Sequence, residues 1–302
     1  MLKKYWPLLL LCVSPLLLAK QVALSFDDGV NPDTNPAAKQ INQDILQHLK
    51  DHKVTAIVFP SLIKTGTGEG LSLIADWGKN GHKIGNHSAQ HVSLNKAEVT
   101  LTQYLDGIDQ AEQSFKSMTG WTPRYRFPYL KEGDTAAKRD GVRAWLQAHH
   151  YQAGDVTIDA SDWYYNQLYQ QYSAKNDAVS LEKLKKAYVD HVVDRAQYYD
   201  GLAFKTLKYS PKHVYLLHVN AINAAYLGDA IAALRQKGWH IIDSDTAYAD
   251  PIYQRKPDNL PAGESLVWAL AKAQGAKGLR YPAEDAPYEK VNLERHGIWV
   301  QP

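Results

Sequence analysis

The segment VALSFDDG, residues 22–29, is the stretch from which the fold can be worked out: apolar and small residues run directly into two carboxylates and a glycine. Neighbouring side chains of a regular strand point to opposite faces, so Asp27 and Asp28 can face one site only where the strand ends. Gly29 permits such a turn because glycine tolerates backbone angles that other residues avoid. A solvated Asp-Asp-Gly turn is the alternative interpretation of these residues.

The same pattern, a short apolar strand followed by a longer helical segment, recurs along the chain. Helical spacing is visible in Ile41, Ile45 and Leu49, which follow the first strand. Alternation of this kind predicts βα units. Seven predicted strands favour an α/β barrel of parallel strands, in which the chemistry gathers at the carboxyl ends of the strands. The predicted strands are residues 22–26, 55–59, 83–86, 124–127, 151–155, 213–217 and 239–242.

Composition and charge narrow the class of protein. The chain has 302 residues, 45% of them apolar and 22% charged, which is typical of a globular protein that is folded throughout. Its 34 basic and 32 acidic side chains give a formal net charge of +2, with no long basic run, so nucleic acid is not an expected partner. Cys12 is the only cysteine and lies near the N-terminus.

The N-terminal residues have the layout of a secretory signal peptide. Lys3 and Lys4 precede an apolar run over residues 8–18, which ends before Ala19. Cleavage after Ala19 would remove Cys12 and leave a chain without disulfides, exported to the periplasm or the extracellular space and not inserted in the membrane. An uncleaved N-terminal membrane anchor is the alternative, because the bulky Leu17 stands at the third position before the cut.

His87 and His91 follow the predicted strand at 83–86 and form a candidate metal-binding pair. Two histidines four residues apart on one helical turn can both reach a single metal ion. The spacing alone is weak support, because His48 and His52 repeat it on a predicted helix with no strand end in front. We expect that second pair to lie on a solvated helix face without a metal.

Three further predicted strands also end in residues that can carry chemistry. Arg126 and Tyr129 follow the fourth strand, Asp162 and Trp163 follow the fifth, and His218 follows the sixth. Each of these alone also fits a structural role, since a single His after an apolar strand is commonly hydrogen-bonded in the core and Asp-Trp commonly forms a turn. The order of all the strand ends is more specific than any one of them.

That order resembles the polysaccharide deacetylase family, also called the NodB-homology domain or carbohydrate esterase family 4. The resemblance spans roughly residues 22–245 and implies a distorted, incomplete (β/α) barrel. The five matching motifs are residues 25–29, 87–91, 126–129, 159–163 and 216–218.

The resemblance divides the chain into a signal peptide at 1–19, a catalytic domain at 20–248 and a C-terminal extension at 249–302. A mostly helical, tyrosine-rich insert at 164–210 within the catalytic domain is longer than the corresponding segment in the family's compact members. Its tyrosines fit helix packing and sugar stacking equally well, and the extension has no counterpart in the minimal domain. Substrate choice is expected to depend on these two segments.

The resemblance also implies a three-ligand metal site formed by Asp28, His87 and His91. A site with one carboxylate and two imidazoles leaves coordination positions open, which suits catalysis. The implied cofactor is one divalent metal ion, with Zn²⁺ as the first choice. Asp27 is then the base that takes a proton from water, and the reaction is the removal of an N-acetyl group from a glycan.

The other motif residues have supporting roles in the family. The resemblance implies that Arg126 holds the base by a charged hydrogen bond, and that the backbone N–H of Tyr129 helps to stabilise the oxyanion. It implies that His218 protonates the departing amine and that Asp162 keeps that His charged. Trp163 and Leu216 would form the walls of the pocket for the acetyl methyl group.

Several functions remain to be weighed against this one. A glycosidase needs two carboxylates on opposite sides of a sugar, and the adjacent Asp27 and Asp28 are poorly placed for that. A non-catalytic carbohydrate-binding protein has no need of base, metal ligands and acid together. Within the enzyme interpretation the substrate is open: it is a chitin-, peptidoglycan- or exopolysaccharide-like glycan, or a non-sugar amide. The sequence identifies no protein partner.

Overall fold

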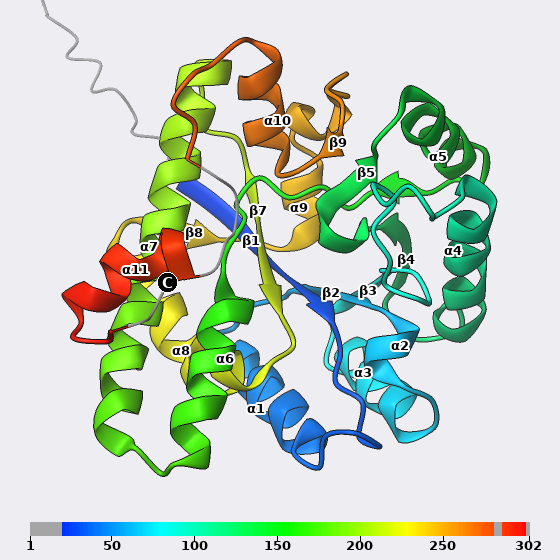
Figure 1. Ribbon diagram of the computed structural model, residues 1–302. Coiled ribbons are helices and arrows are strands. Elements are labelled where there is room, and N and C mark those ends of the chain that lie inside the picture. The colour runs from blue at the N-terminus through cyan, green and yellow to red at the C-terminus, as the bar shows by residue number, and fades with distance from the viewer. Residues whose placement is uncertain (1–19, 281–285, 300–302) are drawn as a thin grey trace, which may run out of the picture.

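The computed structural model describes residues 20–280 and 286–299, and its centre is a strongly curled, parallel half-barrel sheet (Figure 1). The strand order is β6-β4-β3-β2-β1-β7, and β8 pairs with the first residues of β1. All seven predicted strands are present, so the predicted α/β barrel is confirmed. Their bounds are β1 (Lys20–Asp28), β2 (Ile57–Pro60), β3 (Lys83–Asn86), β4 (Trp121–Tyr125), β6 (Gln152–Ala153), β7 (His213–His218) and β8 (Trp239–Ile241).

Helices cover the outside of this sheet because each has one apolar stripe. In α1 the predicted stripe of Ile41, Ile45 and Leu49 is buried. The start of α4 is fixed by a capping box, in which the Thr100 and Gln103 side chains satisfy each other's backbone N–H groups. The covering helices are α1 (Ala38–Asp51), α2 (Leu62–Thr65), α3 (Glu69–Lys79), α4 (Leu101–Phe115), α5 (Ala136–Ala148), α8 (Ala221–Gln236) and α9 (Ser244–Tyr248).

The insert is a pair of long helices, α6 (Asp162–Ala174) and α7 (Ala178–Leu207), and it begins two residues before the expected boundary. Its tyrosines serve mainly in packing: Tyr165, Tyr188 and Tyr199 are fully buried. Stacking on sugar is therefore not available to these three side chains.

The C-terminal extension packs against the barrel and the insert. It contains η2 (Pro251–Gln254), β9 (Ala262–Gly263), α10 (Leu266–Ala273) and α11 (Ala286–Arg295), and both α10 and α11 pack on α7. Figure 1 shows this arrangement with α11 lying across α7.

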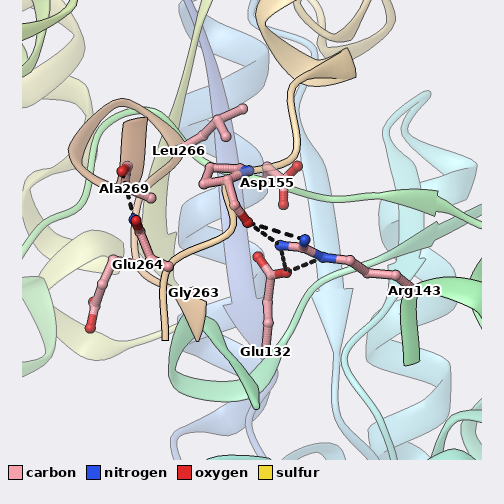
Figure 2. Close-up of a pocket in the computed structure, with 9 residues that line it drawn as sticks. Glu132, Arg143, Asp155, Gly263, Glu264, Leu266 and Ala269 are labelled. Carbon is pink, nitrogen blue, oxygen red and sulfur yellow. Dashed lines mark hydrogen bonds and ion pairs between the residues drawn. The ribbon is translucent and has the colours of Figure 1, made fainter. Parts of the chain in front are cut away.

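An antiparallel pair between β5 (Lys131–Gly133) and β9 joins the extension to the segment that follows β4. This pair was not predicted. Gly263 adopts φ +120°, and a Cβ there would lie 1.9 Å from the carbonyl oxygen of Leu130, so the close approach requires glycine. Figure 2 shows Gly263 of the extension lining a small cavity together with Glu132 and Arg143.

A buried carboxylate holds α11 in place. Glu289 is fully buried and accepts hydrogen bonds from Arg195 (2.7 Å), from His191 Nδ1 (2.9 Å) and from Tyr165 (3.0 Å). The backbone N–H of Ser161, which directly precedes α6, donates in turn to His191 Nε2 at 3.0 Å. The extension is therefore connected to the segment that carries Asp162.

We expect Glu289→Ala to lower the free energy of unfolding by about 3–5 kcal/mol, because removing one partner of a buried ion pair leaves the other partners buried. Urea denaturation would measure the loss. Glu294→Ala is the matched control on the same helix: its ion pair with Lys290 is partly exposed, so a change of about 1 kcal/mol or less is expected. Equal losses in the two variants would contradict the importance of the buried cluster.

The predicted signal peptide at 1–19 lies outside the described residues. Among the helices that the structure describes, none is both long enough and apolar enough to cross a membrane.

Candidate metal centre and active site

The two adjacent carboxylates follow from how β1 ends. Asp28 adopts φ +84° and Gly29 φ +102°, so the turn begins at Asp28 itself, one residue before the predicted glycine. Asp27 is 2% exposed. Because the backbone turns between them, both carboxylates reach the same cavity.

His87 and His91 also reach this cavity, but the predicted helical turn between them is wrong. They lie in an irregular loop after β3, in which Ser88 and His91 adopt φ +65° and +50°. The loop is held by its own side chains: Asn86 accepts from the Ser88 N–H at 2.9 Å, and the Ser88 hydroxyl accepts from the His91 N–H at 3.2 Å. Local hydrogen bonds, rather than helical spacing, bring the two rings together.

Asp28, His87 and His91 together have the donor set of a metal site. Nε2 of His91 lies 3.1 Å and Nε2 of His87 lies 3.9 Å from Oδ1 of Asp28, and one ligand atom of each residue lies within 4.8 Å of the others. Within the described part of the chain no other group of three or more such residues comes as close.

Protonation in the cluster fits a divalent cation. Nδ1–H of His87 donates to the carbonyl of Arg126 at 2.8 Å, which leaves Nε2 with its lone pair toward the cavity. Burial lowers the pKa of His87 to about 4, so the ring is neutral near pH 7. Burial raises the pKa of Asp28, but His91, His218 and His87 outweigh it and the net shift is downward. A neutral imidazole and an ionised carboxylate are what a metal ion requires.

The second histidine pair was expected on a solvated helix face, and that expectation is wrong. His48 and His52 are partly buried between α1 and α8. Nε2 of His48 lies 2.9 Å from the carbonyl oxygen of Ala224, and a Cβ on Gly228 would lie 2.9 Å from the ring of His48. The pair packs against a neighbouring helix and is not part of the metal-ligand cluster.

Arg126 binds Asp27 as the motif implies. Its Nη1 donates to Oδ1 of Asp27 at 2.9 Å and its Nη2 donates to the hydroxyl of Ser25 at 3.1 Å, while Nε donates to the carbonyl of Gly154. The side chain is 1% exposed. A guanidinium held on several sides fixes one carboxylate oxygen of Asp27 and leaves the other facing the cavity, where Oδ2 lies 3.6 Å from Nε2 of His87.

His218 lies at the end of β7 and is paired with Asp162 at the start of α6. Nδ1–H of His218 donates to Oδ1 of Asp162 at 2.7 Å. Oδ2 of Asp162 accepts from the backbone N–H of His218 (2.8 Å) and from the side-chain amides of Asn220 (3.0 Å) and Asn223 (2.8 Å). Burial lowers the pKa of His218, but the adjacent Asp162 carboxylate raises it more, to about 10. The ring is therefore protonated at neutral pH.

The strand-end residues surround one cavity of about 470 Å³. Trp163 and Leu216 line it, as does Tyr129, whose exposed ring contacts His91 with 4.7 Å between ring centroids. The cavity is lined by Asp27, Asp28, Lys64, His87, His91, Tyr129, Leu130, Lys131, Asp159, Ala160, Trp163, Leu216, His218 and Glu264. All the predicted site residues lie here except the two second partners, Arg126 and Asp162.

Some residues of the site were missed by sequence reasoning. Asn220 follows β7 by two residues, so the strand-end criterion could have found it. Lys131 and Glu264 carry no signal of that kind, because the β5–β9 pair that brings them to the cavity joins segments about 130 residues apart. Tyr248, whose hydroxyl lies 3.4 Å from Nη2 of Arg126, comes from α9 and carried none either.

Comparison with known proteins agrees with these observations. A family profile described as "Polysaccharide deacetylase" matches residues 17–145. A peptidoglycan-N-acetylglucosamine deacetylase of Bacillus cereus is 28% identical over 144 residues, which is 47% of this chain and 46% of that protein. The chain thus spans less than half the length of that relative.

A second relative matches over more of the chain. The peptidoglycan-N-acetylmuramic acid deacetylase PdaA of Bacillus subtilis is 28% identical over 230 residues, which is 73% of this chain and 68% of PdaA. The solved structure of PdaA, a family 4 carbohydrate esterase, superposes with a TM-score of 0.51 at 24% identity, covering 76% of this chain and 81% of that one. At this identity the structural likeness concerns the fold.

Proposed function

This chain belongs to the polysaccharide deacetylase family, and from that premise we propose that it is a metal-dependent hydrolase that removes N-acetyl groups from an amino-sugar glycan. The observation that carries the proposal is the meeting of three groups in one cavity: the Asp28, His87 and His91 cluster, the carboxylate of Asp27, and the protonated His218. Amide hydrolysis needs an activated water, a base and an acid, and each has a candidate here.

A divalent metal, Zn²⁺ foremost, would be held by Asp28, His87 and His91, and when bound it would supply Lewis-acid activation of water and of an amide carbonyl. Asp27 takes the proton of the attacking water through its cavity-facing oxygen, while Arg126 keeps that carboxylate oriented. His218 then donates its Nε2 proton to the amine that leaves. Asp162 holds His218 in the tautomer and charge state which that donation requires.

The proposed substrate is an N-acetylated polysaccharide or oligosaccharide. The two relatives are both named as peptidoglycan deacetylases, which supports a peptidoglycan-like glycan ahead of a chitin-like or exopolysaccharide substrate and ahead of a non-sugar amide. We also propose that the chain acts outside the cytoplasm, which the signal-like pattern of residues 1–19 supports. Release of acetate from a panel of N-acetylated glycans by the Zn²⁺-loaded protein tests the function. No release from any of them would contradict it.

A non-catalytic carbohydrate-binding protein on the same fold is the competing function. It would have no use for an oriented carboxylate, metal ligands and a paired, protonated histidine within one cavity. The deacetylase therefore accounts for more of the site than the binding protein does.

Two single substitutions test the division of work between the adjacent carboxylates. Asp28→Asn should weaken Zn²⁺ binding by more than the roughly 10- to 100-fold that loss of an outer-shell partner costs, because it removes the only carboxylate ligand. Asp27→Asn, whose partner is Arg126, should retain the metal. Calorimetric titration with Zn²⁺ measures both affinities, and equal losses in the two variants would show that the two roles are assigned wrongly.

A further inference from the structure

Lys131 and Glu264 lie in the cavity of the proposed active site without a role in the chemistry described above. They form an ion pair with each other, with side chains 28% and 19% exposed. Neither belongs to the metal-ligand cluster. Lys131 begins β5, and Glu264 directly follows β9 of the C-terminal extension, outside the segment that matches the family profile.

The backbone around the pair is built to hold it in place. The N–H of Glu264 donates to the carbonyl of Leu130 at 2.9 Å, which ties the two segments together beside the pair. Leu130 and Glu264 adopt φ +57° and +74°, a region that residues other than glycine rarely occupy. Uncommon backbone conformations at a cavity are typical of functional sites, where the surrounding structure holds them. Here the β5–β9 pair does so.

The charges of the pair suit a neutral, polar ligand. Lys131 and Glu264 compensate each other, so together they offer an anion or a cation little net attraction. Their partly exposed ammonium and carboxylate groups can still donate to and accept from hydroxyl groups, and hydrogen bonds to charged groups are the stronger ones. A sugar unit carries neighbouring hydroxyls that can both donate and accept.

The position of the pair places such a sugar beside the reacting one. Tyr129, two residues before Lys131, contacts His91 of the metal-ligand cluster. The cavity of about 470 Å³ extends from that cluster to the pair. A volume of this size accommodates a ligand larger than a single acetamido group.

We propose that Lys131 and Glu264 form a subsite that binds the hydroxyl groups of a sugar unit adjacent to the one that loses its acetyl group. This proposal rests on the proposed glycan deacetylase function and adds to it that the C-terminal extension takes part in recognising an oligomeric substrate.

The test compares Glu264→Gln and Lys131→Met with the wild-type protein, using an N-acetylglucosamine monomer, the corresponding tetramer and a soluble peptidoglycan glycan tetrasaccharide as probes. Isothermal titration calorimetry measures binding without requiring turnover, and kcat/KM is measured on the same sugars. We expect the tetramer-to-monomer affinity ratio to fall about 10-fold in each variant, the size of one hydrogen bond to a charged group. Asp134→Asn is the control: its ion pair with Lys138 is comparably buried but lies outside the cavity, so the ratio should stay at the wild-type value.

The outcomes separate the subsite from the function. Equal losses for monomer and tetramer, or a lower melting temperature with an unchanged ratio, would show that the pair is only structural and would overturn the subsite. Binding of neither tetrasaccharide by the wild-type protein would overturn it as well. Tetramer binding that depends on both residues, without any acetate release, would support the subsite and contradict the deacetylase. If one of the two variants does not fold, the other decides.

Discussion

Prolonged chelation of the protein should abolish acetate release, and added Zn²⁺ should restore it. Asp28, His87 and His91 are the only group of such residues in the described chain with ligand atoms close enough to hold an ion, so no second site can substitute. Without the ion, Asp27 and His218 would still be in place, but neither can polarise an amide carbonyl as a Lewis acid does. The measurement is acetate release before chelation, after it and after reconstitution, with metal content followed in parallel.

The second histidine pair provides a matched control for this experiment. Replacing His48 and His52 by Ala should leave the metal content unchanged, because these rings pack against α8. The double variant is expected to lose some stability, since the structure shows the pair partly buried. Full activity in a verified metal-free sample, or loss of metal from the double variant, would show that the metal site is assigned wrongly.

The strands and the site at their carboxyl ends were predictable because they depend on local patterns. A run of apolar residues that ends in Asp27 and Asp28 indicates both a strand and its functional end, and the same criterion found His218. The two histidines of the metal-ligand cluster were identified correctly for the wrong reason. Their spacing predicted a helical turn, whereas positive φ angles at Ser88 and His91 bring the rings together in a loop.

Features that depend on contacts between distant segments could not be predicted. The pattern of α1 showed which of its faces is apolar, but not that α8 would also cover His48. A glutamate in a short polar helix ordinarily faces solvent, yet Glu289 is fully buried because Arg195 and His191 from α7 compensate its charge. The β5–β9 pair involves strands of three and two residues, too short to show a periodicity.

His218→Ala should reduce turnover by about 10²- to 10⁴-fold, the usual contribution of a general acid, while metal binding stays largely intact. Burial lowers the pKa of His218, but Asp162 raises it to about 10, with Asp28 and Asp27 adding to the upward shift. A raised pKa keeps the ring protonated at neutral pH, so activity should persist above neutrality and fall as the pH rises through this pKa. The pH profile of kcat for the wild-type protein would show this alkaline limb, and the residual activity of the variant should lack it.

His213→Ala distinguishes a catalytic histidine from a structural one on the same strand. His213 lies at the start of β7, fully buried, with Nε2 3.4 Å from a carboxylate oxygen of Asp200 and outside the cavity that contains His218. Its removal should lower the melting temperature and leave the alkaline limb where it is, because it touches no group of the site. If His218→Ala behaved in this way instead, with normal turnover per folded molecule and an unchanged alkaline limb, His218 would be a structural residue and the leaving amine would take its proton from elsewhere.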